Sequence, residues 1–275
     1  TIFYNLNLQG SLLKITKKKS IKELNKKQSL VCLTAYTRPI AELVNKIADI
    51  ILVGDSLGQV LYGFKSTREV TLDLMILHAK AVCRYATASF VVVDLPYGTY
   101  EKSKEHAYES AERIISETGA SGVKIEGGEH LATTIEYLVK KKINVMGHIG
   151  MLPQSVNSAS EYKVFGKSVK EQEQIIRDIK ALEGAGAFSV VIEATIESLA
   201  RKLTNLVEIP TIGIGASLAC RGQILVTEDL IGLTDFKAKF LKNYCKISST
   251  IMKALEVYKQ EVKQKKFPKT QNIYK

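Results

Sequence analysis

Ionisable side chains follow five short apolar runs of the sequence, and their types suggest chemistry on a small acid. They are Asp55, Asp94, Lys124 with Glu126, His148 and Glu193. A single residue of this kind is often only a strand-end cap or a member of an ion pair. Caps and ion pairs are a poorer explanation for five runs that all end in an ionisable residue. We therefore interpret the set as one catalytic site.

The three carboxylates of this set predict a bound cation. Asp55, Asp94 and Glu126 repel one another unless a positive charge neutralises them. Mg²⁺ prefers oxygen ligands and is commonly held by one or two carboxylates with waters and substrate oxygens, and Mn²⁺ or Co²⁺ can substitute on geometry alone. Zinc is disfavoured, because His148 has no second His or Cys at a comparable position.

The other members of the set predict a binding group and a base. A divalent cation polarises a carbonyl group and stabilises an enolate. Lys124 would bind a substrate carboxylate, and Glu193 would abstract a proton, since its apolar strand favours a raised pKa. These residues therefore predict metal-assisted enolisation of an oxo acid, and they leave the carbon acceptor unspecified.

Alternating strand-like and helix-like segments would bring these residues together. Short β-branched runs predict strands at 31–35, 50–54, 89–94, 121–126, 143–148, 188–193, 210–214 and 223–227. Amphipathic spacing predicts helices near 38–48, 71–86, 101–118, 129–141, 168–186, 196–206 and 237–262.

Eight strands in this order predict an α/β fold with a single (β/α)8 TIM barrel, in which the carboxyl ends of all strands share one mouth. A short N-terminal helix at 20–29 would cap the barrel bottom. We expect a basic segment at 1–19, the barrel at 20–262 and a Lys-rich tail at 263–275. A doubly wound open sheet is the alternative, but no glycine-rich phosphate turn follows an early strand.

Composition narrows the class of protein further. Of 275 residues, 45% are hydrophobic and 24% charged, as in a soluble domain, and no apolar run is long enough to span a membrane. Four widely spaced cysteines without a Cys-x-x-Cys pair indicate buried free thiols in a reducing compartment. The net charge of +11 comes from Lys near both ends, which we interpret as solvated surface and not as a nucleic-acid site. The expected location is the cytoplasm, with a mitochondrial one left open.

A series of motifs, in order over about 25–245, resembles the ketopantoate hydroxymethyltransferase family, also called 3-methyl-2-oxobutanoate hydroxymethyltransferase. They include Leu-Val-Gly-Asp-Ser-Leu-Gly (52–58), Asp-Leu-Pro-Tyr (94–97), Val-Lys-Ile-Glu-Gly-Gly (123–128), Gly-His-Ile-Gly-x-x-Pro-Gln-Ser (147–155) and Ile-Pro-Thr-Ile-Gly-Ile-Gly-Ala (209–216). An ordered series of this length is far more specific than one short motif.

The resemblance implies a homodecameric (β/α)8 enzyme of pantothenate biosynthesis. It would transfer a hydroxymethyl group from 5,10-methylenetetrahydrofolate to 3-methyl-2-oxobutanoate through a Mg-stabilised enolate and give 2-dehydropantoate. Neither a membrane nor a specific nucleic acid is an expected partner.

The resemblance also implies roles for individual residues. Asp55, Asp94 and Glu126 would hold Mg²⁺, with some contacts through water. Ser56 and Lys124 would bind the carboxylate of the keto acid, and Asp94 also belongs to its binding site. His148 would lie beside the incoming hydroxymethyl oxygen, and Glu193 would be the catalytic base that removes the C3 proton.

Departures from the family motifs concern Arg221, Phe165, the stretch 217–220 and the stretch 158–161, which lacks the glycine usual before Tyr-Lys-Val. We expect them on loops after strands five and seven, where they would affect folate binding and subunit contacts more than the metal site. Arg221 is either a compensated surface exchange or a partner for an anionic polyglutamate tail.

Two other classes of function stay open. One is a Mg-dependent carbon–carbon lyase or mutase of the phosphoenolpyruvate/isocitrate-lyase barrel group, which typically places a cysteine on a mobile loop; none of the four cysteines lies in such a context. The other is a non-catalytic barrel scaffold, which would be free to lose its costly clustered acids.

Overall fold

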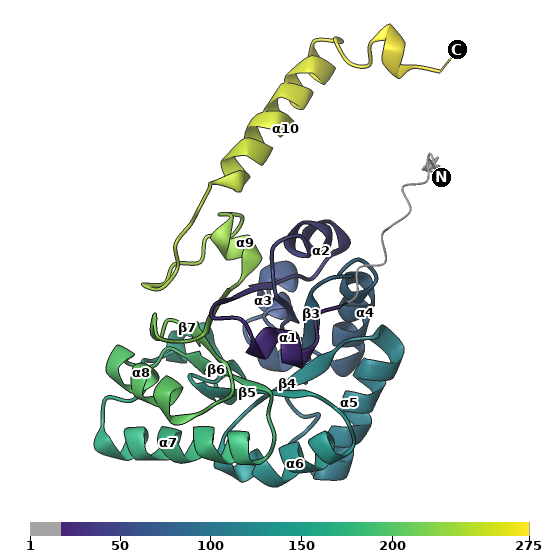
Figure 1. Ribbon diagram of the computed structural model, residues 1–275. Coiled ribbons are helices and arrows are strands. Elements are labelled where there is room, and N and C mark those ends of the chain that lie inside the picture. Colours follow the sequence, from purple (N-terminus) through teal and green to yellow (C-terminus); the bar gives the residue numbers. More distant parts are fainter. Residues whose placement is uncertain (1–17, 275) are drawn as a thin grey trace.

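Eight parallel strands form a closed barrel at the centre of the protein, in a computed structural model that describes residues 18–274 (Figure 1). Each strand pairs with the next, and β8 closes the barrel against β1. The strands are β1 (Leu30–Thr34), β2 (Ile50–Val53), β3 (Phe90–Asp94), β4 (Gly122–Glu126), β5 (Val145–Gly150), β6 (Ser189–Glu193), β7 (Thr211–Ile214) and β8 (Gly222–Leu225). The predicted α/β fold, a (β/α)8 TIM barrel, is confirmed.

Helices surround most of this barrel. They are α1 (Ile21–Asn25), α2 (Arg38–Val44), α3 (Leu57–Tyr62), α4 (Leu72–Cys83), α5 (Lys104–Thr118), α6 (Ala132–Lys140), α7 (Val169–Gly184), α8 (Glu197–Leu206), α9 (Thr227–Leu230) and α10 (Ile247–Lys263). Capping side chains fix the first residues of α4, α5 and α7. The side chains of Thr71, Ser103 and Ser168 each accept a hydrogen bond from a backbone amide in the first turn of the helix that follows.

The helix predicted over 237–262 is wrong in its first ten residues, because α10 begins only at Ile247. The preceding segment is held in an irregular conformation by hydrogen bonds to α9. Asn243 Nδ2 donates to the Asp229 carbonyl at 2.6 Å, and Tyr244 N donates to the Leu230 carbonyl at 2.9 Å. The sequence analysis also missed α3 and α9.

Alternation along the strands divides the apolar residues into two layers. One side of each strand packs inside the barrel, as Phe90 and Val92 do, and Leu24 of α1 joins this interior cluster. The other side packs against the helices, as Val91 and Val93 do. Side chains of a strand point alternately to its two faces, so residues two apart from an interior residue also point into the barrel.

The ends of the chain give a mixed result. Residues 1–17 of the expected basic segment lie outside the described part. A capping box formed by Ser20 and Glu23 begins α1, which is shorter than the segment predicted at 20–29.

Cys245 is exposed, contrary to the expectation of four buried thiols, whereas the other three cysteines are buried and all four are free. Among residues 18–274 no helix is long and apolar enough to cross a membrane.

Candidate active site

All seven predicted site residues line one cavity of about 870 Å³ at the carboxyl ends of the strands. They are Asp55, Ser56, Asp94, Lys124, Glu126, His148 and Glu193. The strand alternation explains this convergence, because the five on strands β3 to β6 lie at even spacings from interior residues such as Val92, Met146 and Val191. The sequence prediction that these side chains converge is confirmed.

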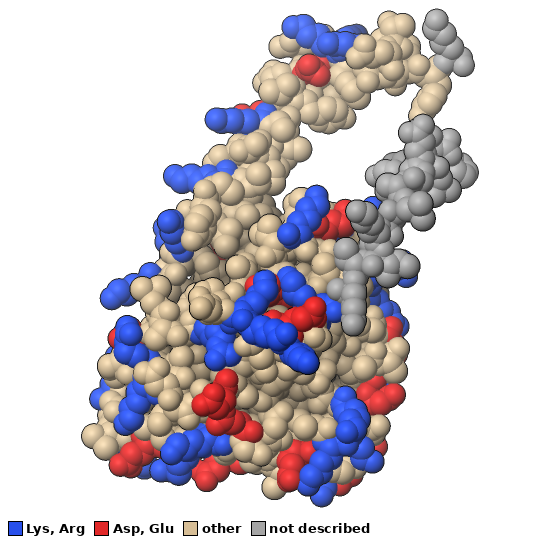
Figure 2. Space-filling view, in the orientation of Figure 1, with Lys and Arg blue, Asp and Glu red and all other residues tan. Residues whose placement is uncertain are grey.

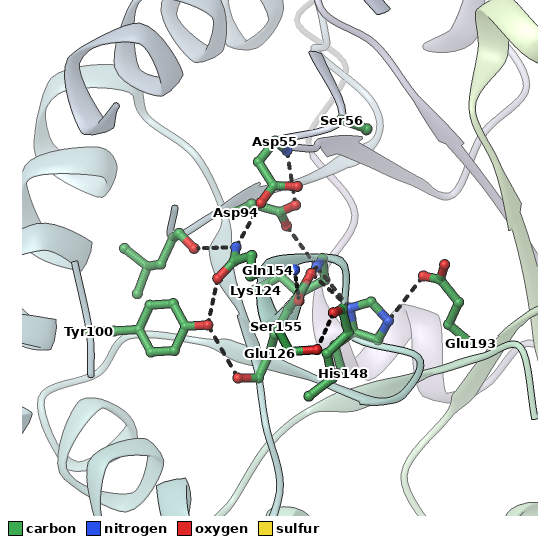
Figure 3. Close-up of polar contacts among 12 residues, drawn as sticks. Asp55, Ser56, Asp94, Tyr100, Lys124, Glu126, His148, Gln154, Ser155 and Glu193 are labelled. Atoms are coloured by element: carbon green, nitrogen blue, oxygen red, sulfur yellow. Dashed lines mark hydrogen bonds and ion pairs between the residues drawn. The ribbon is translucent and has the colours of Figure 1, made fainter. Parts of the chain in front are cut away.

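Lys124 lies between two of the carboxylates. Asp94 and Lys124 are register partners on β3 and β4, and Asp94 Oδ1 lies 3.2 Å from Lys124 Nζ. Glu126 Oε1 lies 3.6 Å from the same nitrogen. Figure 3 shows these contacts around Lys124. All three side chains are almost fully buried, so this ion cluster forms away from bulk water.

His148 connects this cluster to Glu193. It is the register partner of Glu126, and its Nδ1 lies 3.4 Å from Glu126 Oε1 and 3.2 Å from Lys124 Nζ. On the other side of the ring, His148 Nε2 lies 3.1 Å from Glu193 Oε2 (Figure 3). Burial and Lys124 oppose the charged imidazole, but Glu126 and Glu193 outweigh them and raise the pKa of His148.

Glu193 is the least enclosed of these groups. Its side chain keeps 15% of its surface exposed, whereas the side chain of Glu126 keeps 2%. It therefore faces the cavity at a point that a ligand can reach, with the imidazole of His148 behind it.

Asp55 and Ser56 come from the turn between β2 and α3. The Asp55 amide donates to Asp94 Oδ2 at 3.1 Å, which brings the two carboxylates side by side. Ser56 is the residue before α3, and its hydroxyl lies 2.7 Å from the phenol oxygen of buried Tyr36. Two of the predicted site residues thus lie immediately before the short helix that the sequence analysis missed.

The surroundings shift the pKa values of the three carboxyl groups in different directions. Burial raises the pKa of Asp55 well above its usual range, and Asp94 and Glu126 raise it further. Burial also raises the pKa of Asp94, against the opposing effect of Lys124. Burial acts on Glu126 as well, but there Lys124 and His148 prevail and lower its pKa. Ionisation is therefore least favourable at Asp55 and Asp94, whose carboxylate forms a bound cation would stabilise.

Gln154 is a polar residue of the site that the sequence analysis did not assign. Its Nε2 donates to Asp55 Oδ2 at 2.7 Å and to the Leu95 carbonyl at 3.0 Å. Its backbone amide donates to Glu126 Oε2 at 2.9 Å. Gln154 is buried and so touches two of the three carboxylates at once (Figure 3).

Two features of the chain position Gln154. Tyr100 donates its phenol hydrogen to Gln154 Oε1 at 2.6 Å. Gly150 turns the chain after β5 with a φ of 90°, and a Cβ there would collide with the backbone oxygen of Glu193. The motif that contains His148 also contains Gln154, which is the signal that could have identified it.

The donor set fits a divalent cation held mainly by two carboxylates. Among residues 18–274 no three Asp, Glu, His or Cys side chains are arranged to hold a metal by themselves. Asp55 and Asp94, however, lie together, and within the described chain the buried Asp94 Oδ1 has the ion pair with Lys124 Nζ as its polar contact. Two carboxylates completed by waters and substrate oxygens are a common Mg²⁺ site. Both oxygens of Glu126 already have polar neighbours, which favours a contact through water.

Three of the departures from the family motifs, Arg221, Phe165 and the stretch 217–220, lie away from this cluster. The Arg221 carbonyl accepts from the Leu30 amide at the start of β1, so Arg221 lies at the barrel bottom, opposite the cavity mouth. Phe165 forms an isolated parallel β-bridge with Thr195. Neither residue lines the cavity, and neither does the stretch 217–220. The idea that Arg221 holds an anionic tail of a ligand in this cavity is therefore wrong.

Sequence comparison identifies close relatives over nearly the whole chain. The sequence model of the ketopantoate hydroxymethyltransferase family matches residues 14–270. The chain is 50% identical over 246 residues to 3-methyl-2-oxobutanoate hydroxymethyltransferase of Rhizobium rhizogenes, which covers 89% of this chain and 90% of that protein. The protein of the same name from Sinorhizobium medicae is 50% identical over 256 residues, with 93% and 94% covered.

Solved structures with the same fold are much more distant in sequence. A 2,3-dimethylmalate lyase, described as a member of the PEP mutase/isocitrate lyase superfamily, superposes with a TM-score of 0.59 at 14% identity over 92% of this chain and 91% of that one. A phosphonopyruvate hydrolase solved with oxalate and Mg²⁺ gives 0.57 at 11% identity, with 88% of each chain covered. These likenesses support the barrel fold alone.

Proposed function

This chain belongs to the ketopantoate hydroxymethyltransferase family, and from that premise we propose that it transfers a hydroxymethyl group from 5,10-methylenetetrahydrofolate to 3-methyl-2-oxobutanoate. The chain is a hydroxymethyltransferase, and the product would be 2-dehydropantoate, a precursor in pantothenate synthesis. The folate donor and Mg²⁺ are parts of this proposal, as is a cytoplasmic location.

The observation that carries the proposal is the arrangement of a base opposite an acid and lysine cluster. Glu193 reaches the cavity, whereas Asp55, Asp94 and Lys124 are buried at its floor. A 2-oxo acid has a carboxylate and a carbonyl oxygen at one end and an acidic C–H next to the carbonyl. The floor would bind the first end, and Glu193 would face the C–H.

Each residue then has a role that its position supports. The Lys124 ammonium and the Ser56 hydroxyl would bind the carboxylate of the keto acid, with Asp94 beside it. Asp55 and Asp94 would hold Mg²⁺ directly and Glu126 through water. The bound cation would supply the positive charge that stabilises negative charge on the substrate oxygens.

Proton transfer would run through Glu193. Its carboxylate takes the proton from C3 of 3-methyl-2-oxobutanoate, and the electrons of that C–H bond become the enolate. C3 then forms a bond to the one-carbon unit that leaves the folate nitrogens. Over the whole reaction one water is consumed, whose oxygen becomes the new hydroxyl group. His148, 3.1 Å from Glu193, is placed to donate a hydrogen bond near that oxygen.

The lyase or mutase alternative has less support. All four cysteines lie within the described residues, and none of them lines the cavity. The acids and the lysine of the site are all present and in contact, which also disfavours a non-catalytic scaffold.

A complete turnover assay tests the proposal. Purified protein with Mg²⁺, 3-methyl-2-oxobutanoate and 5,10-methylenetetrahydrofolate should form 2-dehydropantoate, measured by mass spectrometry. Omission of folate or addition of a Mg²⁺ chelator should abolish the product. If a folded protein gives no product under saturating conditions, the proposed substrates are wrong.

A further inference from the structure

Recognition of an anionic substrate depends on a few groups inside the cavity. On the face of the barrel that Figure 2 presents, Lys and Arg are interspersed with Asp and Glu, so that surface has no region of one charge that would attract an acid. Inside the cavity, the ammonium of Lys124 is shared between Asp94 and Glu126. A carboxylate bound beside Lys124 would therefore gain from a further donor, and Ser56 brings a hydroxyl to the cavity wall.

The Ser56 hydroxyl is not used to cap the helix that it precedes. A serine at this position commonly accepts a hydrogen bond from an amide of the first turn. Ser56 has a helical φ of −52° and ψ of −18°, and its side chain makes no such bond with α3. A Cβ on Gly54 would lie only 2.9 Å from Ser56 Oγ, so the serine side chain packs closely against the turn. The hydroxyl therefore has a fixed place and is available to a ligand.

Tyr36 lies directly behind Ser56 and outside the cavity. Its phenol oxygen is 2.7 Å from Ser56 Oγ, its side chain is fully buried, and it does not line the cavity. The backbone of Tyr36 is held as well, because His78 Nδ1 lies 2.6 Å from its carbonyl oxygen and the Tyr62 phenol lies 2.8 Å from His78 Nε2. A carbonyl oxygen only accepts hydrogen bonds, so Nδ1 donates this one. Tyr36 thus has a fixed position from which it can act on Ser56.

The phenol of Tyr36 keeps its hydrogen. Burial raises the pKa of Tyr36, and the nearby carboxyl groups of Glu228 and Asp229 raise it further. Hydrogen bonds with Ser56 and Thr34 oppose this rise in pKa without reversing it. The phenol thus offers one hydrogen and one oxygen to two hydroxyl neighbours, so the direction of its bond with Ser56 depends on the hydroxyl of Thr34.

A backbone amide sets the direction of these hydrogen bonds. The Thr227 amide, which can only donate, donates to Thr34 Oγ1 at 3.0 Å. Thr34 is buried, so its own hydrogen needs an acceptor, and the phenol oxygen of Tyr36 provides one. The phenol hydrogen then goes to Ser56 Oγ, which leaves the Ser56 hydrogen directed at the cavity. The reverse order would leave the Thr34 hydrogen without an acceptor in the described chain.

We propose that Tyr36 is a positioning residue that orients the Ser56 hydroxyl as a donor to the carboxylate of the keto acid. A carboxylate only accepts hydrogen bonds, and its charge strengthens a bond from a hydroxyl group. With the opposite orientation, the lone pairs of Ser56 Oγ would face that carboxylate and repel it. The inference rests on the proposed function, because it takes Ser56 to bind a keto acid.

A double-mutant cycle tests whether Tyr36 acts through Ser56. Mg²⁺-dependent exchange of the C3 proton of 3-methyl-2-oxobutanoate gives KM and kcat without folate. Tyr36→Phe should raise KM by about 3–10-fold, the size of one hydrogen bond between neutral groups, and should change kcat much less. In a Ser56→Ala background the same substitution should have no further effect. Tyr85→Phe, at a partly buried tyrosine outside the cavity, should leave KM unchanged.

Failure of this inference can be told apart from failure of the proposed function. If Ser56→Ala raises KM and Tyr36→Phe does not, the inference alone is overturned. The same holds if Tyr36→Phe has its full effect in the Ser56→Ala background. If Ser56→Ala leaves KM unchanged, or if a folded wild type gives no exchange, the proposed function is contradicted and the inference with it.

Variants of Thr34 test the direction of the hydrogen bonds. Thr34→Val removes the hydroxyl that donates to Tyr36, so KM should rise by about 2–5-fold. Thr34→Ser keeps that hydroxyl and should raise KM less. Equal KM values for the two variants would contradict the proposed direction. Thermal unfolding confirms that the variants compared are folded.

Discussion

Gln154 Nε2 lies 2.7 Å from Asp55 Oδ2, although the two residues are 99 positions apart in the chain. The same glutamine binds Glu126 through its backbone amide, and Tyr100 holds its amide oxygen. Groups behind metal ligands fix the orientation of those ligands. Gln154 therefore positions the carboxylates of the proposed Mg²⁺ site without being a ligand itself.

Gln154→Leu should weaken Mg²⁺ binding by about 10-fold or more, because Asp55 loses the donor that orients it. Isothermal titration of Mg²⁺ into the folded protein measures this directly. Ser155→Ala is the matched control, since the Ser155 hydroxyl bonds only the nearby Leu152 carbonyl among the described groups. Equal Mg²⁺ affinity in the two variants would show that Gln154 does not act on the metal site.

Asp94→Asn should raise the Mg²⁺ concentration needed for half-maximal thermal stabilisation by at least about 10-fold. The reason is that one of the two adjacent carboxylates loses its charge, and stabilisation by a ligand follows its affinity for the folded state. Asp73→Asn is the control, because Asp73 is an exposed partner of Arg113. A Mg²⁺ titration that Asp94→Asn leaves unchanged would exclude Asp94 as a ligand.

Lys124→Met should raise the KM for 3-methyl-2-oxobutanoate by about 10-fold or more, because the keto-acid carboxylate loses its cationic partner. Mg²⁺ should also stabilise this variant more than the wild type, since Asp94 and Glu126 lose a neutralising charge. Steady-state kinetics and thermal unfolding measure the two effects. A folded variant with unchanged KM would remove Lys124 from the substrate site.

Glu228→Gln should stabilise the protein at pH 8 and have little effect at pH 5. Glu228 is buried, Oε2 has no hydrogen-bond partner in the described chain, and burial raises its pKa to about 7. The folded state thus binds a proton more tightly than the unfolded state, so stability is lost as pH rises from the ordinary range of a glutamate toward 7.

The glutamine side chain of this variant does not ionise, so its free energy of unfolding at pH 8 should exceed that of the wild type by about 1–3 kcal/mol. Denaturant unfolding at the two pH values measures it, with the exposed Glu112→Gln as control. A difference between variant and wild type that does not depend on pH would disprove the raised pKa.

Strand positions and the residues that end them could be predicted from the sequence because both depend on local pattern. Asp94, Glu126 and Glu193 close apolar runs, and the barrel then requires them to meet at one mouth. Gln154 could not be found in this way, since it lies on a loop whose path depends on contacts with Asp55 and Tyr100.

Two other differences between the sequence prediction and the structure also depend on how the chain folds in three dimensions. The residues before Ile247 have a helical pattern but bond to α9 instead, so tertiary contacts override local preference there. Arg221 was expected at the cavity mouth because it follows strand seven in sequence. The connection, however, runs back down to the start of β8, which places Arg221 at the other end of the barrel.

Proton exchange at C3 of 3-methyl-2-oxobutanoate tests most directly whether Glu193 and the metal site form an enolising centre. Proton NMR in D₂O follows the loss of the C3 signal with protein and Mg²⁺ and without folate. The account predicts rapid exchange that requires both the protein and Mg²⁺, and a loss of at least about 100-fold in Glu193→Gln, with Mg²⁺ binding retained. Exchange that is equally fast in Glu193→Gln, or absent from a folded wild type that binds Mg²⁺, would contradict it.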